Sequence, residues 1–138
     1  PVLGVIYDFA SGKIYSGVVD KGANCNDKAI EVSRAASYDQ AILATGFPSS
    51  RDYSEIALET SIRSIQRFKK IRMIGSAALS LALVSSGILD AYMEEDIWLW
   101  DVAAGLALVK SAGGAYKISD VKDSFQIDVI ATNGLMEN

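Results

Sequence analysis

The stretch WDVAAG, residues 100–105, is followed eight residues later by the pair Gly113-Gly114. Residues 101–112 are almost wholly apolar, which predicts a buried helix that the glycine pair terminates. Asp101 places one carboxylate at the mouth of this helix, where backbone N–H groups or a cation must meet its charge. The simplest interpretation is a helix N-cap, because aspartate is a favoured capping residue.

The residues just before this helix favour a second interpretation. Trp98 and Trp100 bracket the approach to Asp101, and three acids, residues 94–96, lie slightly further upstream. Carboxylate oxygens grouped beside a buried helix suit a hard divalent cation such as magnesium. At this point both roles for Asp101, helix cap and metal ligand, stay open.

The rest of the chain alternates strand-like and helix-like segments, which predicts a layered α/β fold. The first two strands are expected to form a hairpin, and residues 21–28 are expected to be a loop. An amphipathic helix is predicted over residues 53–69, and a buried helix is predicted between Gly75-Ser76 and Gly87. Strands are expected at residues 2–9, 13–19, 29–32, 40–45, 70–74, 89–93, 115–119 and 127–131.

The composition argues against several classes of protein. At 138 residues and 50% hydrophobic side chains, the chain is long enough for a globular core. The formal net charge of -4 disfavours nucleic acid as a partner, because phosphate backbones require a basic surface. The chain has no histidine, which excludes an imidazole base and a conventional zinc site. Its basic cluster at residues 67–72 is interpreted as a solvated helix end.

Cysteine usage and hydropathy indicate where the protein works. Cys25 is the single cysteine, so no intrachain disulfide can form and a reducing, cytoplasmic location is expected. The longest apolar region, residues 73–89, is interrupted by serine and glycine and is too short to span a bilayer. No signal peptide is visible, and no membrane partner is expected.

Residues 71–114, IRMIGSAALSLALVSSGILDAYMEEDIWLWDVAAGLALVKSAGG, closely resemble the second signature region of the inositol monophosphatase family. That family comprises magnesium-dependent, lithium-sensitive phosphomonoesterases. The flanking segments are similar as well. Residues 1–23 resemble the strand pair after the family's first metal motif, and residues 129–134 resemble its closing strand. The resemblance therefore covers nearly the whole chain.

Two segments of the family pattern are absent, namely Gly-Glu-Glu and Asp-Pro-(Ile/Leu)-Asp-Gly-Thr. The only prolines are Pro1 and Pro48, and Pro48 follows Phe47, so no Asp-Pro pair exists here. The resemblance implies the C-terminal half of a layered α-β sandwich of the inositol monophosphatase and sugar phosphatase type. Residues 1–34 would then complete the N-terminal sheet of the missing half, and residues 35–138 would form a C-terminal α/β domain.

The resemblance also implies roles for five residues. Gly75, Ser76 and Ala77 match the backbone segment that contacts substrate, although Gly-Ser before an apolar helix is by itself only a capping signal. Glu94 matches the acid that hydrogen-bonds substrate hydroxyls. Asp101 matches a catalytic ligand of the second magnesium ion. The water-activating threonine and the other carboxylates belong to the absent segments, so we expect the isolated chain to be inactive.

The implied function is hydrolysis of inositol monophosphate or a related sugar phosphate. Where animal members have a glycine and a histidine between the substrate acid and the tryptophan, this chain has Asp96 and Trp98, so the substrate stays open. The alternatives are a fructose-1,6-bisphosphatase or a 3′-phosphonucleotide phosphatase of the same superfamily. A further alternative is a non-catalytic fragment that acts only as an interaction module. The expected protein partners are the missing N-terminal half and a second copy in a homodimer.

Overall fold

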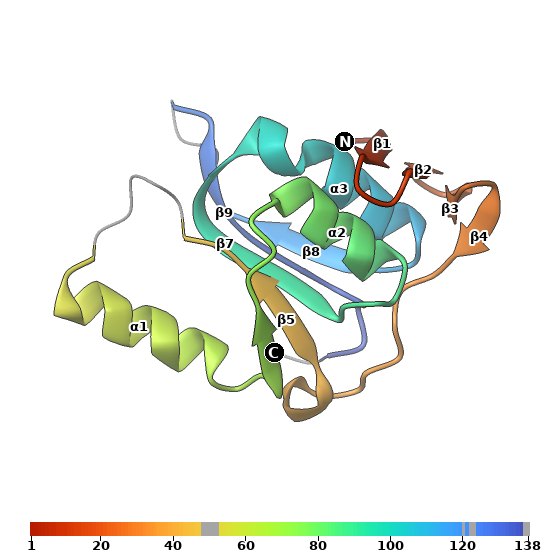
Figure 1. Ribbon diagram of the computed structural model, residues 1–138. Coiled ribbons are helices and arrows are strands. Elements are labelled where there is room, and N and C mark those ends of the chain that lie inside the picture. The colour runs from red at the N-terminus through yellow and green to blue at the C-terminus, as the bar shows by residue number, and fades with distance from the viewer. Residues whose placement is uncertain (48–52, 120, 122–123, 137–138) are drawn as a thin grey trace.

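The computed structural model describes residues 1–47, 53–119, 121 and 124–136. Two β-sheets enclose a middle layer formed by two helices, and a third helix lies outside the second sheet (Figure 1). The predicted layered α/β arrangement is confirmed. Among the described residues, no helix is long and apolar enough to cross a membrane.

The first sheet is an antiparallel meander. Its strands are β1 (Leu3–Asp8), β2 (Lys13–Val18), β3 (Gly22–Cys25) and β4 (Lys28–Ile30), in this spatial order. The expected loop at residues 21–28 is therefore wrong, because it contains β3 and the start of β4. The polar pair Asn26-Asp27 has φ values of 46° and 65°, which suit a two-residue hairpin turn between these strands. Because these residues are polar and favour turns, the sequence predicted a loop where the structure has a hairpin.

The second sheet is mixed and has the strand order β6-β5-β7-β9-β8. Its strands are β5 (Ile42–Thr45), β6 (Lys70–Arg72), β7 (Ala91–Trp98), β8 (Ala115–Ile118) and β9 (Gln126–Thr132). β5 runs parallel to β6 and to β7, whereas β9 is antiparallel to both of its neighbours. A 3₁₀ turn, η1 (Tyr38–Gln40), precedes β5.

Strand β7 extends five residues beyond the expected end at position 93. A run of acids is unfavourable in a strand, but pairing with β9 on both sides of a bulge overrides this local preference. The bulge lies between Glu94 and Ile97, and Asp96 within it has a φ of 52°. The acids at 94–96 consequently belong to a strand of the second sheet.

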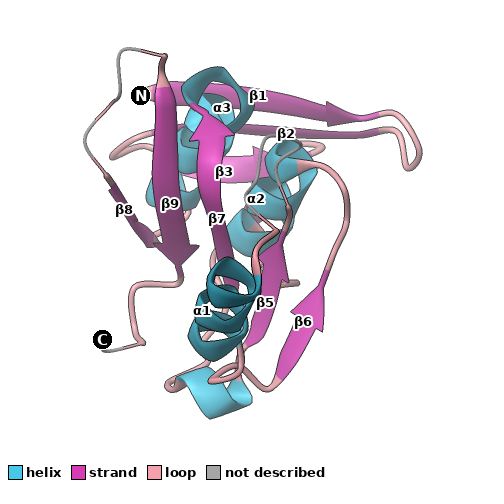
Figure 2. Cartoon of the chain, turned by 90° about the vertical axis from the view of Figure 1, so that its left-hand side faces the viewer, coloured by secondary structure: helices cyan, strands magenta, loops and turns pink. Residues whose placement is uncertain are grey.

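Helices α2 (Ala77–Ser85) and α3 (Leu99–Ser111) form the middle layer, as their apolar character predicts. Gly87 and Gly113 follow their C-caps with φ values of 70° and 92°, so both predicted helix ends are confirmed. Helix α1 (Glu55–Ile65) covers the opposite face of the second sheet (Figure 2). The main core lies between the second sheet and the two middle helices.

Candidate active site

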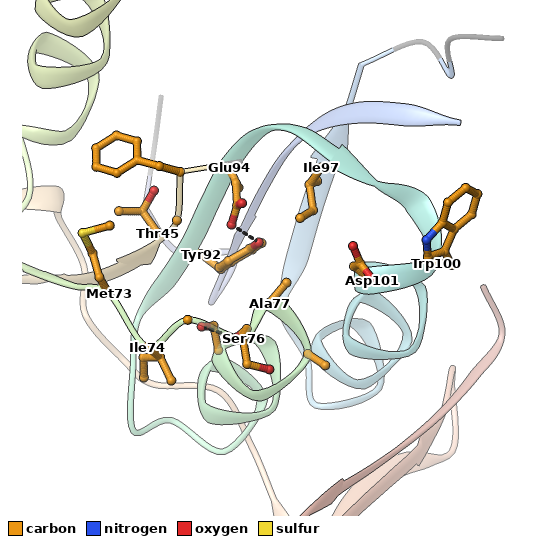
Figure 3. A pocket seen from close by; sticks show the side chains of 15 residues that line it. Thr45, Met73, Ile74, Ser76, Ala77, Tyr92, Glu94, Ile97, Trp100 and Asp101 are labelled. Carbon is orange, nitrogen blue, oxygen red and sulfur yellow. Dashed lines mark hydrogen bonds between the residues drawn. The ribbon is translucent and has the colours of Figure 1, made fainter. Parts of the chain in front are cut away.

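A cavity of about 700 Å³ opens where four segments of the chain meet. Its walls are the end of β5, the loop and first turn of α2, the outer part of β7 and the start of α3 (Figure 3). The parallel strands β5 and β7 both direct their carboxyl ends here. Open α/β sheets bind their ligands at this kind of edge. The cavity brings together all five site residues that the resemblance implied, Gly75, Ser76, Ala77, Glu94 and Asp101.

The loop before α2 both caps the helix and lines the cavity. Gly75 has a φ of 80°, which favours glycine and turns the chain into the helix. The Ser76 hydroxyl accepts a hydrogen bond from the backbone N–H of Leu79 at 3.2 Å, so the capping interpretation is confirmed. The N-terminus of α2 therefore faces the cavity with its positive dipole end, an arrangement that favours anionic ligands.

Glu94 is held by a neighbouring tyrosine. The Tyr92 hydroxyl donates a hydrogen bond to Oε2 of Glu94 at 2.6 Å (Figure 3). Burial raises the pKa of the Glu94 carboxyl, the hydrogen bond from Tyr92 lowers it, and the charge of Asp101 raises it. Burial is also the main cause that raises the pKa of Tyr92, so its hydroxyl stays protonated as a donor.

The structure corrects the cap interpretation of Asp101. Helix α3 begins at Leu99, and its N-cap is Trp98, whose side chain makes no capping hydrogen bond. Asp101 therefore lies within the first turn, because β7 runs directly into the helix. Its exposed carboxylate faces the cavity, where it complements the positive end of the α3 dipole (Figure 3).

The expected group of three acids is divided by the strand. Successive side chains of a strand point to opposite faces, so Glu95 contributes to grooves beside α1 and β8 instead of to the cavity. The backbone N–H of Asp96 donates to Oδ1 of Asp128 at 3.0 Å across the bulge. No group of three or more potential metal-ligating Asp, Glu or Cys side chains occurs in the described part of the chain. The cavity thus offers a pair of carboxylates, Glu94 and Asp101.

The sequence predicted a strand that ends at Thr45, as observed, but it gave no role in the site to this strand end or to Tyr92. The Thr45 hydroxyl donates to the carbonyl of Met93 at 2.7 Å, which fixes the end of β5 against β7. Gly46 follows, and a Cβ atom at this position would collide with the Glu94 carboxylate in its observed place. Tyr92 was detectable in principle, because it lies two residues before Glu94 and so shares its strand face. Nothing in the neighbouring sequence indicates that Gly46 lies beside Glu94.

The two tryptophans also lie together. Their ring centroids are 4.9 Å apart with an interplanar angle of 11°, and Phe125 lies 6.0 Å from the Trp100 ring. Trp100 lines the cavity together with Asp101. The aromatic pair therefore borders the candidate active site at the start of α3.

Comparison with known proteins identifies the family to which this fold belongs. The model of the inositol monophosphatase family matches residues 1–138, and the chain belongs to that family. The resemblance seen in the sequence is confirmed.

Several known proteins are similar over nearly the whole chain. It is 36% identical to an inositol-1-monophosphatase of Synechocystis, over 97% of this chain and 48% of the relative. It is 36% identical to a fructose-1,6-bisphosphatase/inositol-1-monophosphatase of Aquifex aeolicus, over 96% of this chain and 50% of the relative. The solved inositol monophosphatase of Anabaena matches with a TM-score of 0.86 and 33% identity, over 98% of this chain and 55% of that one. The chain spans about half the length of the curated relatives it matches.

Proposed function

We propose that this chain is the C-terminal part of a magnesium-dependent phosphomonoesterase whose substrate is inositol monophosphate or a related sugar phosphate. The observation that carries the proposal is the convergence of the α2 N-terminus, Glu94 and Asp101 on one cavity from three separate segments. These three features supply an anion-binding helix end, an acceptor for hydroxyl groups and a ligand for a hard cation.

Asp101 is the residue that would hold magnesium. Its donor chemistry fits, because an exposed carboxylate at the cavity wall is a preferred ligand of that ion. The ion supplies Lewis-acid polarisation of a phosphoryl oxygen when it is bound. In this role Asp101 is the catalytic residue of the chain.

The other four residues would bind and orient the substrate. The backbone at Gly75, Ser76 and Ala77 receives the anionic phosphate end, because unpaired N–H groups and the helix dipole both favour negative charge there. Glu94 accepts hydrogen bonds from sugar hydroxyls. Tyr92 keeps the Glu94 carboxyl in place through its hydroxyl, so it acts as a positioning residue.

The rest of the machinery would come from a preceding N-terminal half. The outer face of the first sheet supports this, because its side chains are apolar yet exposed: Leu3, Val5, Tyr7, Ile14 and Val18. A group of exposed apolar side chains on one sheet face is typical of an interface. Residues 1–34 would then belong to a sheet shared with the missing half, and residues 35–138 would form the C-terminal domain.

Assembly and location complete the proposal. Helix α1 exposes Ile56 and Ile62, which are 79% and 56% accessible, and such a surface would suit a second copy in a homodimer. Cys25 forms no disulfide and is half-buried, consistent with a reducing, cytoplasmic location.

A fructose-1,6-bisphosphatase activity is the second candidate function. It is favoured by the double name of the Aquifex aeolicus relative.

The test is to compare this chain with the longer protein that would contain it. We expect the longer protein to release phosphate from inositol 1-phosphate or fructose 1,6-bisphosphate only when magnesium is present. The isolated chain should be slower by about a thousandfold or more, because it lacks most groups that stabilise the transition state. Magnesium-dependent turnover by the purified chain would contradict the proposal that a preceding N-terminal half supplies the rest of the active site. A longer protein without phosphatase activity would favour the interaction module.

A further inference from the structure

The cavity has an apolar rim on the side of β5 and β6, and the function proposed above gives this rim no role. The rim consists of Met73 and Ile74, which follow β6, and Phe47, which follows β5. These side chains line the cavity and are 59%, 38% and 43% exposed. Single exposed apolar side chains are common, but three that come from two separate loops and border one cavity are typical of a binding surface.

The strand order separates the apolar rim from Asp101. The parallel strands β6, β5 and β7 lie side by side in this order, and the rim follows the first two whereas Asp101 follows β7. Glu94 of β7 lies next to the end of β5, because a Cβ atom at Gly46 would lie 2.5 Å from its Oε2. Figure 3 shows Met73 and Ile74 on one side of Glu94 and Asp101 on the other. The site acid thus lies between a charged part and an apolar part of the cavity.

We propose that the apolar rim binds an alkyl substituent on the sugar of the substrate. The inference rests on the proposed function and narrows its substrate class to sugar phosphates that carry an alkyl chain. The phosphate group lies at the α2 N-terminus and Asp101, and the sugar hydroxyls meet Glu94. The alkyl chain then lies against the apolar rim. The cavity volume of about 700 Å³ is within the range of pockets that enclose drug-sized ligands, so it has room for such a substituent.

The chemistry of the rim favours an alkyl chain over further hydroxyl groups. A hydroxyl that is pressed against apolar side chains loses its hydrogen bonds to water and gains none in return. A methylene group in the same place leaves water favourably, and its full burial strengthens binding about fourfold. The side chain of Met73 is unbranched and adaptable, so it can follow the shape of a flexible chain.

The rim can be tested with a series of esters that differ only in the alkyl chain. The probes are the 6-phosphates of methyl, butyl and hexyl β-glucoside, and the measurement is kcat/KM for phosphate release by the longer protein in magnesium buffer. The phosphate group and the sugar hydroxyls are the same in all three esters. We expect kcat/KM to rise with chain length and to be about tenfold higher for the hexyl ester than for the methyl ester, because only part of the chain leaves water.

Two variants locate the effect. Met73→Gln keeps the length of the side chain but makes its end polar, and Phe47→Ser removes the ring. Each should lower the hexyl-to-methyl ratio of kcat/KM to about threefold. Ile88→Gln is the matched control, because Ile88 is 56% exposed and does not line the cavity, and it should leave the ratio unchanged. A general loss of stability or of phosphate binding cancels in this ratio, since both esters are measured on the same variant.

The outcomes separate the inference from the proposed function. If the longer protein hydrolyses inositol 1-phosphate but hydrolyses the three glucosides equally or not at all, the role of the rim is overturned and the phosphatase proposal stands. If the ratio is tenfold but persists in both rim variants, the alkyl chain binds elsewhere and the rim is again overturned. If neither inositol 1-phosphate nor any glucoside releases phosphate with magnesium, the proposed function fails and the inference falls with it.

Discussion

The carboxylate of Glu94 lies against the backbone of Gly46: a Cβ atom at position 46 would lie 2.5 Å from Oε2 of Glu94. Real Cβ atoms do not approach so closely, so position 46 must be glycine if Glu94 is to keep its place. The same oxygen accepts the Tyr92 hydroxyl at 2.6 Å. Gly46, which follows the end of β5, and Tyr92 of β7 therefore determine where the site acid points.

Gly46→Ala should displace the Glu94 side chain and break its hydrogen bond with Tyr92. The clash involves the flexible end of a side chain, so we expect a modest loss of about 0.5–1.5 kcal/mol in the free energy of unfolding. Denaturant titration measures this loss. In a Glu94→Ala background the same substitution should cost almost nothing, and an equal cost in both backgrounds would show that Glu94 is not the clashing group.

Gly105→Ala should be more harmful, because it affects the contact between the two buried helices. A Cβ at position 105 would collide with the Leu81 side chain close to its Cβ, where it cannot move aside. Overpacking of a close-packed core costs about 1–3 kcal/mol, and thermal melting should show the loss. Combined with Leu81→Ala, the substitution should cost clearly less, whereas simple additivity would contradict the proposed collision.

Asp101→Asn should separate the metal-ligand role from a structural role. In the longer protein we expect the magnesium-dependent rate to fall about a hundredfold or more, because an amide is a weaker ligand than a carboxylate. The free energy of unfolding should fall by only about 0.3–1 kcal/mol, since the residue contributes a first-turn charge and no cap. Glu95→Gln is the control, because Glu95 does not line the cavity. If the activity of the Asp101→Asn enzyme lies within twofold of the activity of this control, the metal-ligand role of Asp101 is excluded.

Glu94→Gln should make the chain more stable at neutral pH. Burial raises the pKa of Glu94, so the folded chain resists ionisation that the unfolded chain permits. Both states are protonated below the ordinary pKa of glutamate, and the penalty grows as pH rises from that ordinary pKa to the raised pKa of the folded chain, above which it stays constant. Denaturant midpoints should therefore favour the glutamine variant at pH 7 and converge with those of the unaltered chain at low pH. A difference that is constant with pH would contradict burial as its cause.

Val5→Lys tests the outer face of the first sheet. We expect the isolated chain to self-associate through this face, since it exposes five large apolar side chains. A lysine at its centre should shift sedimentation equilibrium toward the monomer. Ile88→Lys is the matched control, because Ile88 is 56% exposed and Val5 is 57% exposed. An equal effect of both substitutions would indicate unspecific association.

Local patterns in the sequence determined the middle layer of the fold. The apolar runs of α2 and α3, the Gly75-Ser76 start and the terminating glycines at 87 and 113 predicted two buried helices, which the structure confirms. Such signals work because capping and burial of a whole helix depend on residues within a few turns of each other. The five implied site residues were likewise recognisable from one continuous motif, since they lie on segments adjacent in sequence.

Only the tertiary structure decided how these residues face one another. Pairing of β7 with β9, which lies 32 residues away at the Asp96–Asp128 contact, carries the strand through the acids 94–96 and turns Glu94 into the cavity but Glu95 away from it. The same pairing starts α3 at Leu99 and so removes Asp101 from the cap position. Strand pairing between distant segments leaves no local signature, because its energy comes from a partner that the nearby sequence does not contain.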